Sequence, residues 1–318
     1  DPGGENSAAQ SPPLRQVLRP RRRLVQPRMM ESAVRDLGRL DGPVLCFGGP
    51  YSNAQATEAL LVEARTRGIP PDRVICTGDV VAYGGDPQAC VDLVRNAGIQ
   101  MVMGNCEESL GFNADDCNCG FEKDSDCAAW SADWFTHAAS VLDGDALAWM
   151  RCLPRQLRFF LAGRKIAVIH GGDQNISDYV FASTPDVAKA VILDRLDADA
   201  VIGGHSGLPF TQVLGPRLWH NAGAIGMPAN DGTPRGWYSI LTGSDDGIDI
   251  TLHGLVYDHH AAALAIRAVT PGLPYAQTLE DGLWPNMAVL PETEHGLQGL
   301  ALEPPPVHWP NRLTVAAE

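Results

Sequence analysis

The chain has no run of roughly eighteen apolar residues, so the sequence predicts no membrane-spanning helix. It also has no excess of basic residues. Its 24 Lys and Arg stand against 38 Asp and Glu, which gives a formal net charge of −14 at pH 7. A general nucleic-acid binder presents basic faces to the phosphate backbone, and we therefore expect no strong nucleic-acid binding. A phosphorylated small molecule is still a suitable ligand, because a bound metal supplies positive charge locally.

The N-terminal segment lacks the apolar stretch that a secretory or twin-arginine signal needs. Arginines are frequent up to Arg28, but no apolar run follows them. The sequence therefore predicts no secretory or twin-arginine signal, and a cytoplasmic location is expected. We interpret residues 1–42 as an Arg- and Pro-rich arm and lead-in, of which residues 1 to about 28 are either a flexible arm or upstream sequence. A transit peptide and a nucleic-acid-binding arm are the alternatives.

From Val44 onward, short apolar runs alternate with segments of helical periodicity. Helices are predicted for residues 53–67, 87–97 and 186–196, and a β-hairpin for residues 237–252. This alternation is typical of a layered α/β sheet structure. We assign residues 43–275 to one domain and residues 276–318 to a Pro-rich tail packed on it.

Four apolar runs, each predicted to be a strand, are followed by a metal-binding residue beside a glycine. The runs are residues 74–76, 101–103, 166–169 and 200–202, and the residues that follow them are Asp79, Asn105, His170 and His205. Ligands at the carboxyl ends of buried strands converge above one edge of a sheet, where open α/β folds bind their ligands. One Asp, one Asn and two His form a mixed oxygen and nitrogen set that suits Mn, Fe or Zn.

The order of these segments resembles the calcineurin-like metallophosphoesterases, especially their small bacterial phosphodiesterase branch. The family's motifs read, in order, D-x-H-G-N, G-D-x-x-x-Y-G, G-N-H-D/E, H-G, G-H-T-H and N-P-G-S-V-G-x-P. Corresponding segments of this chain are residues 49–53, 78–84, 104–107, 170–171, 204–207 and 221–228. The resemblance covers roughly residues 43–275. It implies an α-β-β-α sandwich, in which helices flank two mixed sheets.

The resemblance implies one metal site where members of the family have two. In the family, the Asp of G-D bridges both metals, and here it is Asp79. The other ligands of one metal are the D-x-H pair and the second His of G-H-T-H, which are replaced here by Gly49, Tyr51 and Gly207. The ligands of the other metal are all present as Asp79, Asn105, His170 and His205. We therefore expect one divalent transition metal, with the second metal in doubt.

The histidine of G-N-H, which contacts the substrate phosphate in the family, is replaced by Cys106. Positive charge favours a thiolate, so a thiol beside a metal is a candidate ligand or nucleophile. With Asp79 and Asn105 it forms the expected catalytic set. The alternative is an inert side chain that fills the space of the histidine.

Four further positions are candidates for substrate binding by the same resemblance. Tyr51 is either a plug in the vacated metal site or a phenol that donates to the substrate. Asn53 retains the Asn of the family and is expected to hydrogen-bond the site loop. Asn221 and Gly223 belong to the last motif, where backbone N–H groups can approach a phosphate, although glycines there can also serve only a tight turn.

The segment 107–127 is an acidic insert that carries Cys117, Cys119 and Cys127. One interpretation is a second thiol site, which binds a soft metal or an iron–sulfur cluster or places thiols over the main metal. The other is a lid loop with incidental cysteines, because the spacing matches no standard zinc or ferredoxin pattern. The irregular spacings favour a reducing compartment over a disulfide framework. Core packing is predicted for Cys46, Cys76, Cys90 and Cys152.

Three functions are consistent with these patterns. The first is a metal-dependent phosphoester hydrolase, a phosphodiesterase or phosphatase with an atypical one-metal site, acting on a small phosphorylated molecule or nucleotide. The second is a binding or sensing protein on the same fold, which a nucleotide stabilises without being turned over. The third is a redox protein that uses the thiols of Cys106, Cys117 and Cys119. A homo-oligomer is compatible with each of them.

Overall fold

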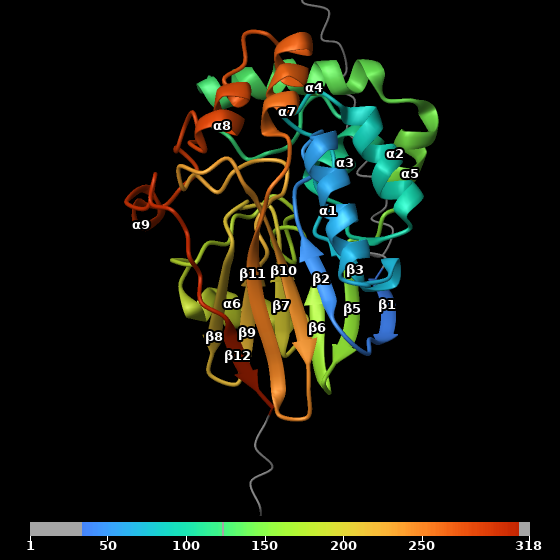
Figure 1. The fold of residues 1–318 in the computed structure, drawn as a ribbon, viewed down its shortest axis with the longest axis vertical. Coiled ribbons are helices and arrows are strands. Elements are labelled where there is room, and N and C mark those ends of the chain that lie inside the picture. The colour runs from blue at the N-terminus through green and yellow to red at the C-terminus, as the bar shows by residue number, and fades with distance from the viewer. Residues whose placement is uncertain (1–33, 123, 312–318) are drawn as a thin grey trace, which may run out of the picture. The chain divides into compact units, whose positions relative to one another are not determined.

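The computed structural model describes residues 34–122 and 124–311. The arginine-rich segment up to Arg28 lies outside the described residues. In the described part, two six-stranded sheets lie face to face and helices cover both outer surfaces (Figure 1). This is the α-β-β-α sandwich that the sequence predicts, and the prediction of the fold is confirmed.

We call the two sheets the A sheet and the B sheet. The B sheet contains the strands that precede Asp79 and Asn105. Its strand order is β12-β11-β10-β2-β3-β4. The bounds are β2 Val44–Phe47, β3 Val74–Cys76, β4 Gln100–Met101, β10 Gly236–Gly243, β11 Gly247–Leu255 and β12 Val307–Pro310. Strands β2, β3 and β4 run parallel, whereas β10 pairs antiparallel with both β2 and β11. The sheet is therefore mixed, and the predicted hairpin forms β10 and β11.

The A sheet contains the strands that precede His170 and His205. Its strand order is β1-β5-β6-β7-β9-β8. The bounds are β1 Val34–Arg39, β5 Gln156–Leu161, β6 Arg164–Val168, β7 Ala200–Gly203, β8 Phe210–Leu214 and β9 Arg217–Asn221. Strands β6, β7 and β9 are parallel neighbours, so their carboxyl ends lie at one end of the sheet.

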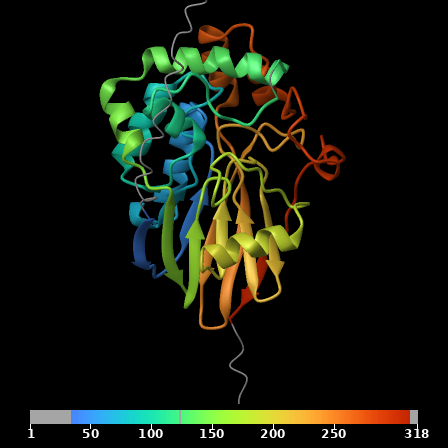
Figure 2. The same ribbon diagram turned by 180° about the vertical axis from the view of Figure 1, so that it is seen from behind.

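Helices cover the outer faces of the two sheets. Those beside or above the B sheet are α1 Ala54–Thr66, α2 Pro87–Ala97, α3 Asn105–Gly111, α4 Asp126–Val141, α5 Gly144–Arg151, α7 His259–Val269 and α8 Tyr275–Asp281. The A sheet is covered by α6, Asp186–Arg195, as Figure 2 shows. The short helices η1 Pro71–Arg73 and α9 Glu292–His295 lie in connections. No helix among the described residues is long and apolar enough to cross a membrane.

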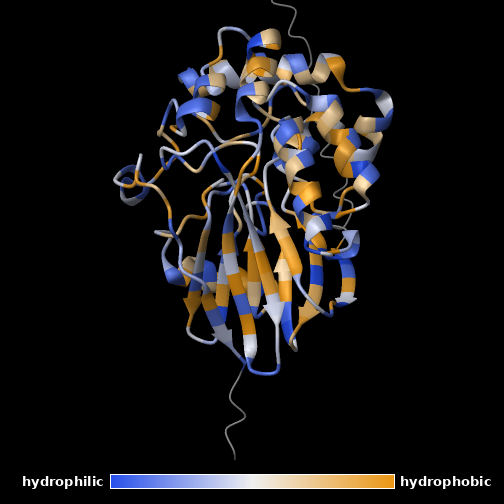
Figure 3. Ribbon diagram, in the orientation of Figure 1, coloured by the Kyte–Doolittle hydropathy of each residue, from blue (hydrophilic) through white to orange (hydrophobic). Residues whose placement is uncertain are grey.

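The side chains of β2 show why the strands read as continuous apolar runs. Leu45 and Phe47 pack in the core beneath the helices, and Val44 and Cys46 pack in the core between the sheets. All four are completely buried. Because both faces of the strand are covered, the alternation of a half-exposed strand is absent. Apolar residues accordingly colour much of the central strands in Figure 3.

Local signals fix the predicted helix ends. The Asn53 side chain accepts a hydrogen bond of 3.0 Å from the backbone N–H of Ala56 and so caps α1. Helix α2 begins at Pro87 and ends at Gly98, whose φ of 66° is left-handed. These two helices and α6 are where the sequence predicts them.

Each of two segments near the ends of the described chain adds an edge strand to one sheet. Strand β1 lies within the predicted lead-in and pairs with β5, and β12 lies within the predicted tail and pairs with β11. Helix α8 also crosses the predicted boundary between residues 275 and 276. The prediction that Cys152 packs in the core is wrong, because this residue follows α5 at the surface and is exposed.

Candidate metal centre

The four predicted metal ligands meet where the two sheets end side by side. Asp79 and Asn105 follow β3 and β4 of the B sheet, and His170 and His205 follow β6 and β7 of the A sheet. The prediction of a site above one sheet edge therefore needs correction. Two sheets packed face to face bring the carboxyl ends of their parallel strands to the same end of the sandwich. The ligands are shared equally between the sheets.

The donor atoms of these residues surround one point. His170 Nε2 lies 3.0 Å from Asn105 Oδ1, 3.1 Å from His205 Nδ1 and 3.3 Å from Asp79 Oδ2. The ligand atoms of Asp79, His170 and His205 all lie within 4.8 Å of one another. Two imidazole nitrogens, a carboxylate and an amide oxygen at these separations fit a divalent transition metal. We call these four residues the metal cluster.

Hydrogen bonds orient two of the ligands. The Nδ1–H of His170 donates to the carbonyl oxygen of Thr77 at 2.6 Å, which leaves Nε2 with a free lone pair toward the cluster. The Nδ2 group of Asn105 donates to the carbonyl oxygen of Cys117 at 2.8 Å, so its Oδ1 faces His170. Backbone carbonyls from β3 and from the insert therefore act as the second layer of the site.

The glycines beside the ligands leave room for them. A Cβ atom at Gly104 would lie 2.3 Å from Asp79 Oδ1, and one at Gly78 would lie 2.7 Å from His170 Nδ1. Asp79 and His205 themselves have φ values of 59° and 57°, in the left-handed region that non-glycine residues seldom adopt. Such backbone strain is concentrated at functional sites, where the surrounding structure holds it in place.

The cluster is electrostatically coupled. Burial alone would raise the pKa of Asp79, but the charge and hydrogen bond of His170 outweigh it and lower the pKa. Burial opposes the charged form of His170, yet Asp79 raises the pKa of this imidazole above its usual value. Burial and the neighbouring His170 lower the pKa of His205 to about 3, so its imidazole is neutral, as a metal ligand must be.

Glu107 is a site residue that the analysis of the sequence did not single out. Its fully buried carboxylate accepts hydrogen bonds from the backbone N–H groups of Asp79, Val80 and Gly104 at 2.7–2.9 Å. Burial and the charge of Asp79 raise its pKa to about 7. The residue thus ties the loop that carries Asp79 to the start of α3. The acidic position of the G-N-H-D/E motif was the signal that could have identified it.

Tyr51 fills the space beside the positions that the second metal would need. The ring carbon Cζ lies 2.4 Å from where a Cβ atom of Gly49 would stand, and the hydroxyl lies 3.8 Å from the Cβ position of Gly207. The side chain is buried, and its backbone N–H donates to the carbonyl oxygen of Asp79 at 3.1 Å. A phenol ring therefore occupies the place beside Asp79 where a carboxylate at position 49 would project.

Three of the predicted substrate-binding residues form hydrogen bonds within the loops that surround the site. Asn53 caps α1 and donates from Nδ2 to the carbonyl oxygen of Gly226 at 3.1 Å. Asn221 donates to Gly204 O and Ser206 Oγ, each at 3.0 Å, and accepts from the N–H of Gly223 at 2.8 Å. Both amides are buried and their hydrogen bonds stay within the protein. These groups shape the loops around His205, and the bond from Asn53 to Gly226 confirms that Asn53 hydrogen-bonds the site loop. That Asn53, Asn221 and Gly223 contact substrate stays a prediction.

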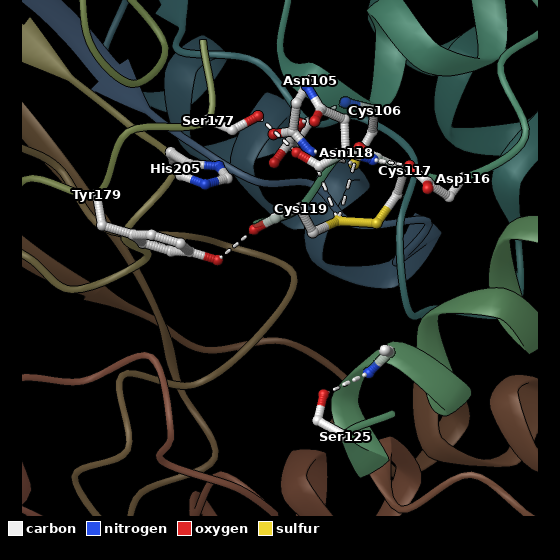
Figure 4. Close-up of a disulfide and its surroundings, with 12 residues drawn as sticks. Asn105, Cys106, Asp116, Cys117, Asn118, Cys119, Ser125, Ser177, Tyr179 and His205 are labelled. Carbon is white, nitrogen blue, oxygen red and sulfur yellow. Dashed lines mark hydrogen bonds between the residues drawn. A yellow bond between two sulfur atoms is a disulfide. The ribbon is translucent and has the colours of Figure 1, made fainter. Parts of the chain in front are cut away.

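Three cysteines gather over the metal cluster (Figure 4). Cys117 and Cys119 form a disulfide, which corrects the expectation of free thiols at these two positions. Cys119 Sγ lies 3.5 Å and Cys106 Sγ 3.6 Å from Nδ2 of Asn105. Burial and the charges of Asp79 and Glu107 raise the pKa of Cys106, so the metal-free site holds a neutral thiol. The predicted third member, Cys127, stands on α4 at the wall of a neighbouring pocket.

Residues 52–246 match the calcineurin-like phosphoesterase superfamily domain. Since the match spans more than half of the 318 residues, the chain belongs to this superfamily. It is 27% identical over 223 residues to the uncharacterized protein MJ0912 of Methanocaldococcus jannaschii, which covers 63% of this chain and 82% of that protein.

Two solved structures are similar in fold. A metallophosphoesterase from Sphaerobacter thermophilus superposes with a TM-score of 0.58 at 22% identity, covering 77% of this chain and 100% of that one. The hypothetical protein PH1004 from Pyrococcus horikoshii OT3 has a TM-score of 0.64 at 14% identity, covering 76% and 98%. At these identities the two structures support the fold alone, and the chemistry has to be argued from the residues of this chain.

Proposed function

We propose that the protein hydrolyses phosphoesters, as a phosphodiesterase or phosphatase, with a single divalent transition metal. The observation that carries the proposal is the asymmetry of the site. Three donor atoms lie within 3.3 Å of a fourth, His170 Nε2, while the ring of Tyr51 takes up the space beside Gly49 and Gly207. The superfamily supports metal-dependent phosphoester hydrolysis in general, and the asymmetry supports the one-metal form of it.

The residues of the chain take separate roles in this proposal. The metal cluster would hold Mn, Fe or Zn, which when bound would act as a Lewis acid on a phosphoryl oxygen. Thr77 and Cys117 orient two of the ligands through their carbonyl oxygens, and Glu107 fixes the loop of Asp79. Cys106 lies beside Asn105 and its backbone N–H donates to Asp79 Oδ1 at 3.3 Å. We propose it as an additional ligand once a metal lowers the pKa of its thiol.

Metal stoichiometry together with turnover tests the proposal. Protein purified without chelators should contain close to one transition metal per chain by plasma mass spectrometry, and it should hydrolyse a chromogenic phosphodiester. His170→Ala should lose both the metal and the turnover, whereas His260→Ala, which changes an exposed histidine on α7, should lose neither. A content near two metals per chain would contradict the one-metal site.

A second candidate function is ligand binding or sensing without turnover. It is favoured by the enclosure of the site, because Asp79, Asn105 and His170 are each at most 4% exposed. The insert adds to this enclosure, since Cys117 contacts Asn105 directly. In this case a nucleotide would raise the melting temperature of the metal-loaded protein and be recovered unchanged. Turnover that disappears in His170→Ala would contradict this alternative.

For the substrate we propose a small phosphorylated molecule or a nucleotide. The net charge of −14 disfavours a polyanionic nucleic acid, while the metal supplies the positive charge that one phosphoryl group needs. A cytoplasmic site of action and a homo-oligomeric state remain predictions from the sequence.

A further inference from the structure

A pocket lined by aromatic side chains opens directly beside the metal cluster. Its walls include Tyr51, Tyr83, Trp130, Tyr179, Tyr275 and Trp284, together with His205 of the cluster. These residues come from the loops after β2, β3 and β6, from α4, from α8 and from the segment that follows α8. We call this the aromatic pocket. Its volume is about 80 Å³.

The chemistry of the aromatic pocket is unusual for this chain. Seven of its lining residues are Phe, Tyr or Trp, although these types make up only 7% of the sequence. Among the described residues that line it, none is Asp, Glu, Lys or Arg. An uncharged wall of rings offers stacking and edge-to-face contacts to another ring and no counter-charge for an ion. The pocket therefore favours a neutral aromatic group over an ionised one.

The rings are held in place before any ligand arrives. Tyr83 contacts Tyr51 edge-to-face at 5.1 Å and Tyr275 at 4.7 Å, and Trp130 stands against Tyr275 at 6.2 Å. Trp284 donates from Nε1 to the carbonyl oxygen of Pro228 at 2.7 Å. A wall that is already ordered loses little conformational freedom on binding, which is what a recognition site requires.

The aromatic pocket and the metal cluster share a boundary. The ring of Tyr179 lies 4.2 Å from that of His205, and its hydroxyl donates to Cys119 O at 2.8 Å. Gly207 lines the pocket, and a Cβ atom at this position would stand 3.6 Å from the indole of Trp284 and 3.8 Å from the Tyr51 hydroxyl. His205 Nε2 is buried and has no hydrogen-bond partner within the described part of the chain. A group attached to a phosphoryl oxygen at the cluster can reach this pocket.

We infer that the aromatic pocket binds a single aromatic ring carried by the phosphoester substrate. The inference rests on the proposed function and specifies its substrate class, namely an aryl or pyrimidine-type ester. The volume of about 80 Å³ is roughly half that of an apolar cavity of about 150 Å³ that holds one benzene molecule, so the pocket can enclose part of one ring and no more. One ring can enter with an edge toward solvent, whereas a fused two-ring purine exceeds the space.

Binding of phosphonates, which are not hydrolysed, tests the inference independently of catalysis. Phenylphosphonate, cyclohexylphosphonate and methylphosphonate are titrated by calorimetry into the full-length protein loaded with Mn²⁺. Burial and stacking of one ring should make phenylphosphonate bind on the order of tenfold more tightly than methylphosphonate, with cyclohexylphosphonate between them. Trimethylammonioethylphosphonate is included, because aromatic walls can also hold a quaternary ammonium group. Tighter binding of this cation than of phenylphosphonate would overturn the inference.

Variants locate the binding site. Tyr275→Leu and Trp284→Leu should each reduce the preference for phenylphosphonate over methylphosphonate toward unity, and Trp284 is only half-buried, so its variant should fold. Phe112→Leu is the matched control, since this ring is 50% exposed, lies outside the pocket and should leave the preference unchanged. A preference near one in the unaltered protein, or one that survives both pocket variants, would overturn the inference.

Turnover of methyl p-nitrophenyl phosphate, measured in parallel, separates this inference from the proposed function. Hydrolysis without any preference for the phenyl group overturns the role of the pocket and leaves the phosphoesterase intact. A clear phenyl preference without hydrolysis supports the pocket and contradicts the enzyme. If the protein shows neither binding of the phosphonates nor hydrolysis, both the inference and the proposed function are contradicted.

Discussion

The two halves of the candidate site meet at Asp79 and are built in opposite ways. On one side, His170 and Asn105 are aimed at Asp79 by backbone carbonyls, and their donor atoms are 3.0 Å apart. On the other side, glycines stand at positions 49 and 207, and the ring of Tyr51 fills the space beside them. One half is arranged for a cation and the other for aromatic packing.

The difference shows that the two sides of one aspartate can be built for different purposes, one with four possible metal ligands and the other with a packed aromatic ring. Both halves keep the strained backbone that such a loop requires, with φ of 59° at Asp79 and 49° at Tyr51. The two halves differ in the side chains that project from it. A tyrosine supplies enough volume to keep the interior packed, because a void would remove its neighbours' contacts. The half that contains Tyr51 borders the aromatic pocket.

The largest effect is expected from removing the anchor of the metal-binding half. Glu107→Ala would leave three buried backbone N–H groups unpaired, each with a penalty of about 1–3 kcal/mol, and would release the loop of Asp79. We expect a loss of roughly 3 kcal/mol or more in the free energy of unfolding, measured with urea, together with loss of bound metal. Glu108→Ala alters the neighbouring, partly exposed carboxylate and should change stability by less than about 1 kcal/mol. Equal losses in the two variants would show that Glu107 is no special anchor.

A double-mutant cycle between Gly49 and Tyr51 tests directly whether the Tyr51 ring occupies the place of a second metal site. Gly49→Asp alone places a Cβ atom 2.4 Å from the Tyr51 ring and should destabilise the protein by about 1–3 kcal/mol through overpacking. In a Tyr51→His background the same change should be tolerated, which gives a coupling energy of roughly 1 kcal/mol or more. With Gly207→His added, metal content should rise from one toward two per chain. If Gly49→Asp is equally damaging in both backgrounds, Tyr51 is not what occupies the second site.

The Cys117–Cys119 disulfide allows a test of the metal-binding half, since both of its cysteines contact Asn105. Its segment supplies the carbonyl that orients Asn105, so Cys117→Ser should weaken metal binding by about 10- to 100-fold, the usual effect of losing a second-layer contact. Cys152→Ser, at an exposed free cysteine, is the control. Metal affinity is measured by competition with a chromogenic chelator, with and without a dithiol reductant. Tighter binding after reduction would contradict this prediction and favour thiols as ligands.

The sequence could single out the four residues that meet at the candidate site because their signal is local. Each of Asp79, Asn105, His170 and His205 follows an apolar run and stands beside a glycine, and the clashes at Gly78 and Gly104 explain why glycine is needed. The residues that complete the site carry no such local signal. The carbonyl of Cys117 reaches Asn105 only because the insert folds back over α3, which no spacing of residues reveals.

The sequence predicted the layers of the fold, but it did not predict which strands belong to which sheet. Runs such as residues 44–47 are apolar throughout, and that pattern says that both faces are covered without saying by which sheet. Hence the sequence placed all four ligands above one edge, whereas they belong to two sheets. Strands β1 and β12 were missed for the related reason that edge strands are largely exposed, so their apolar pattern is weak.

The last prediction concerns the contact between the sheets on which both halves depend. His220 on β9 is completely buried and hydrogen-bonds Thr211 Oγ1 of the A sheet at 2.8 Å and Ser239 Oγ of the B sheet at 2.7 Å. Burial lowers its pKa from 6.5 to about 3. Above pH 6.5 the imidazole is neutral whether folded or unfolded. Between pH 6.5 and about 3 only the unfolded chain binds the proton, so this group lowers stability as the pH falls, by up to about 1.4 kcal/mol per pH unit.

His220→Gln removes this titratable imidazole and keeps a hydrogen-bonding side chain. The variant should be less stable than the unaltered protein at pH 7.5 by about 1–3 kcal/mol, because the replacement fills the inter-sheet space less well. The difference should shrink as the pH falls from 6.5 to 4.5, since only the protein with His220 suffers the added penalty. Urea unfolding of both proteins at matched pH values measures it, and the other carboxylates and histidines titrate alike in the two. Parallel stability curves across this range would mean that His220 does not resist protonation in the folded protein.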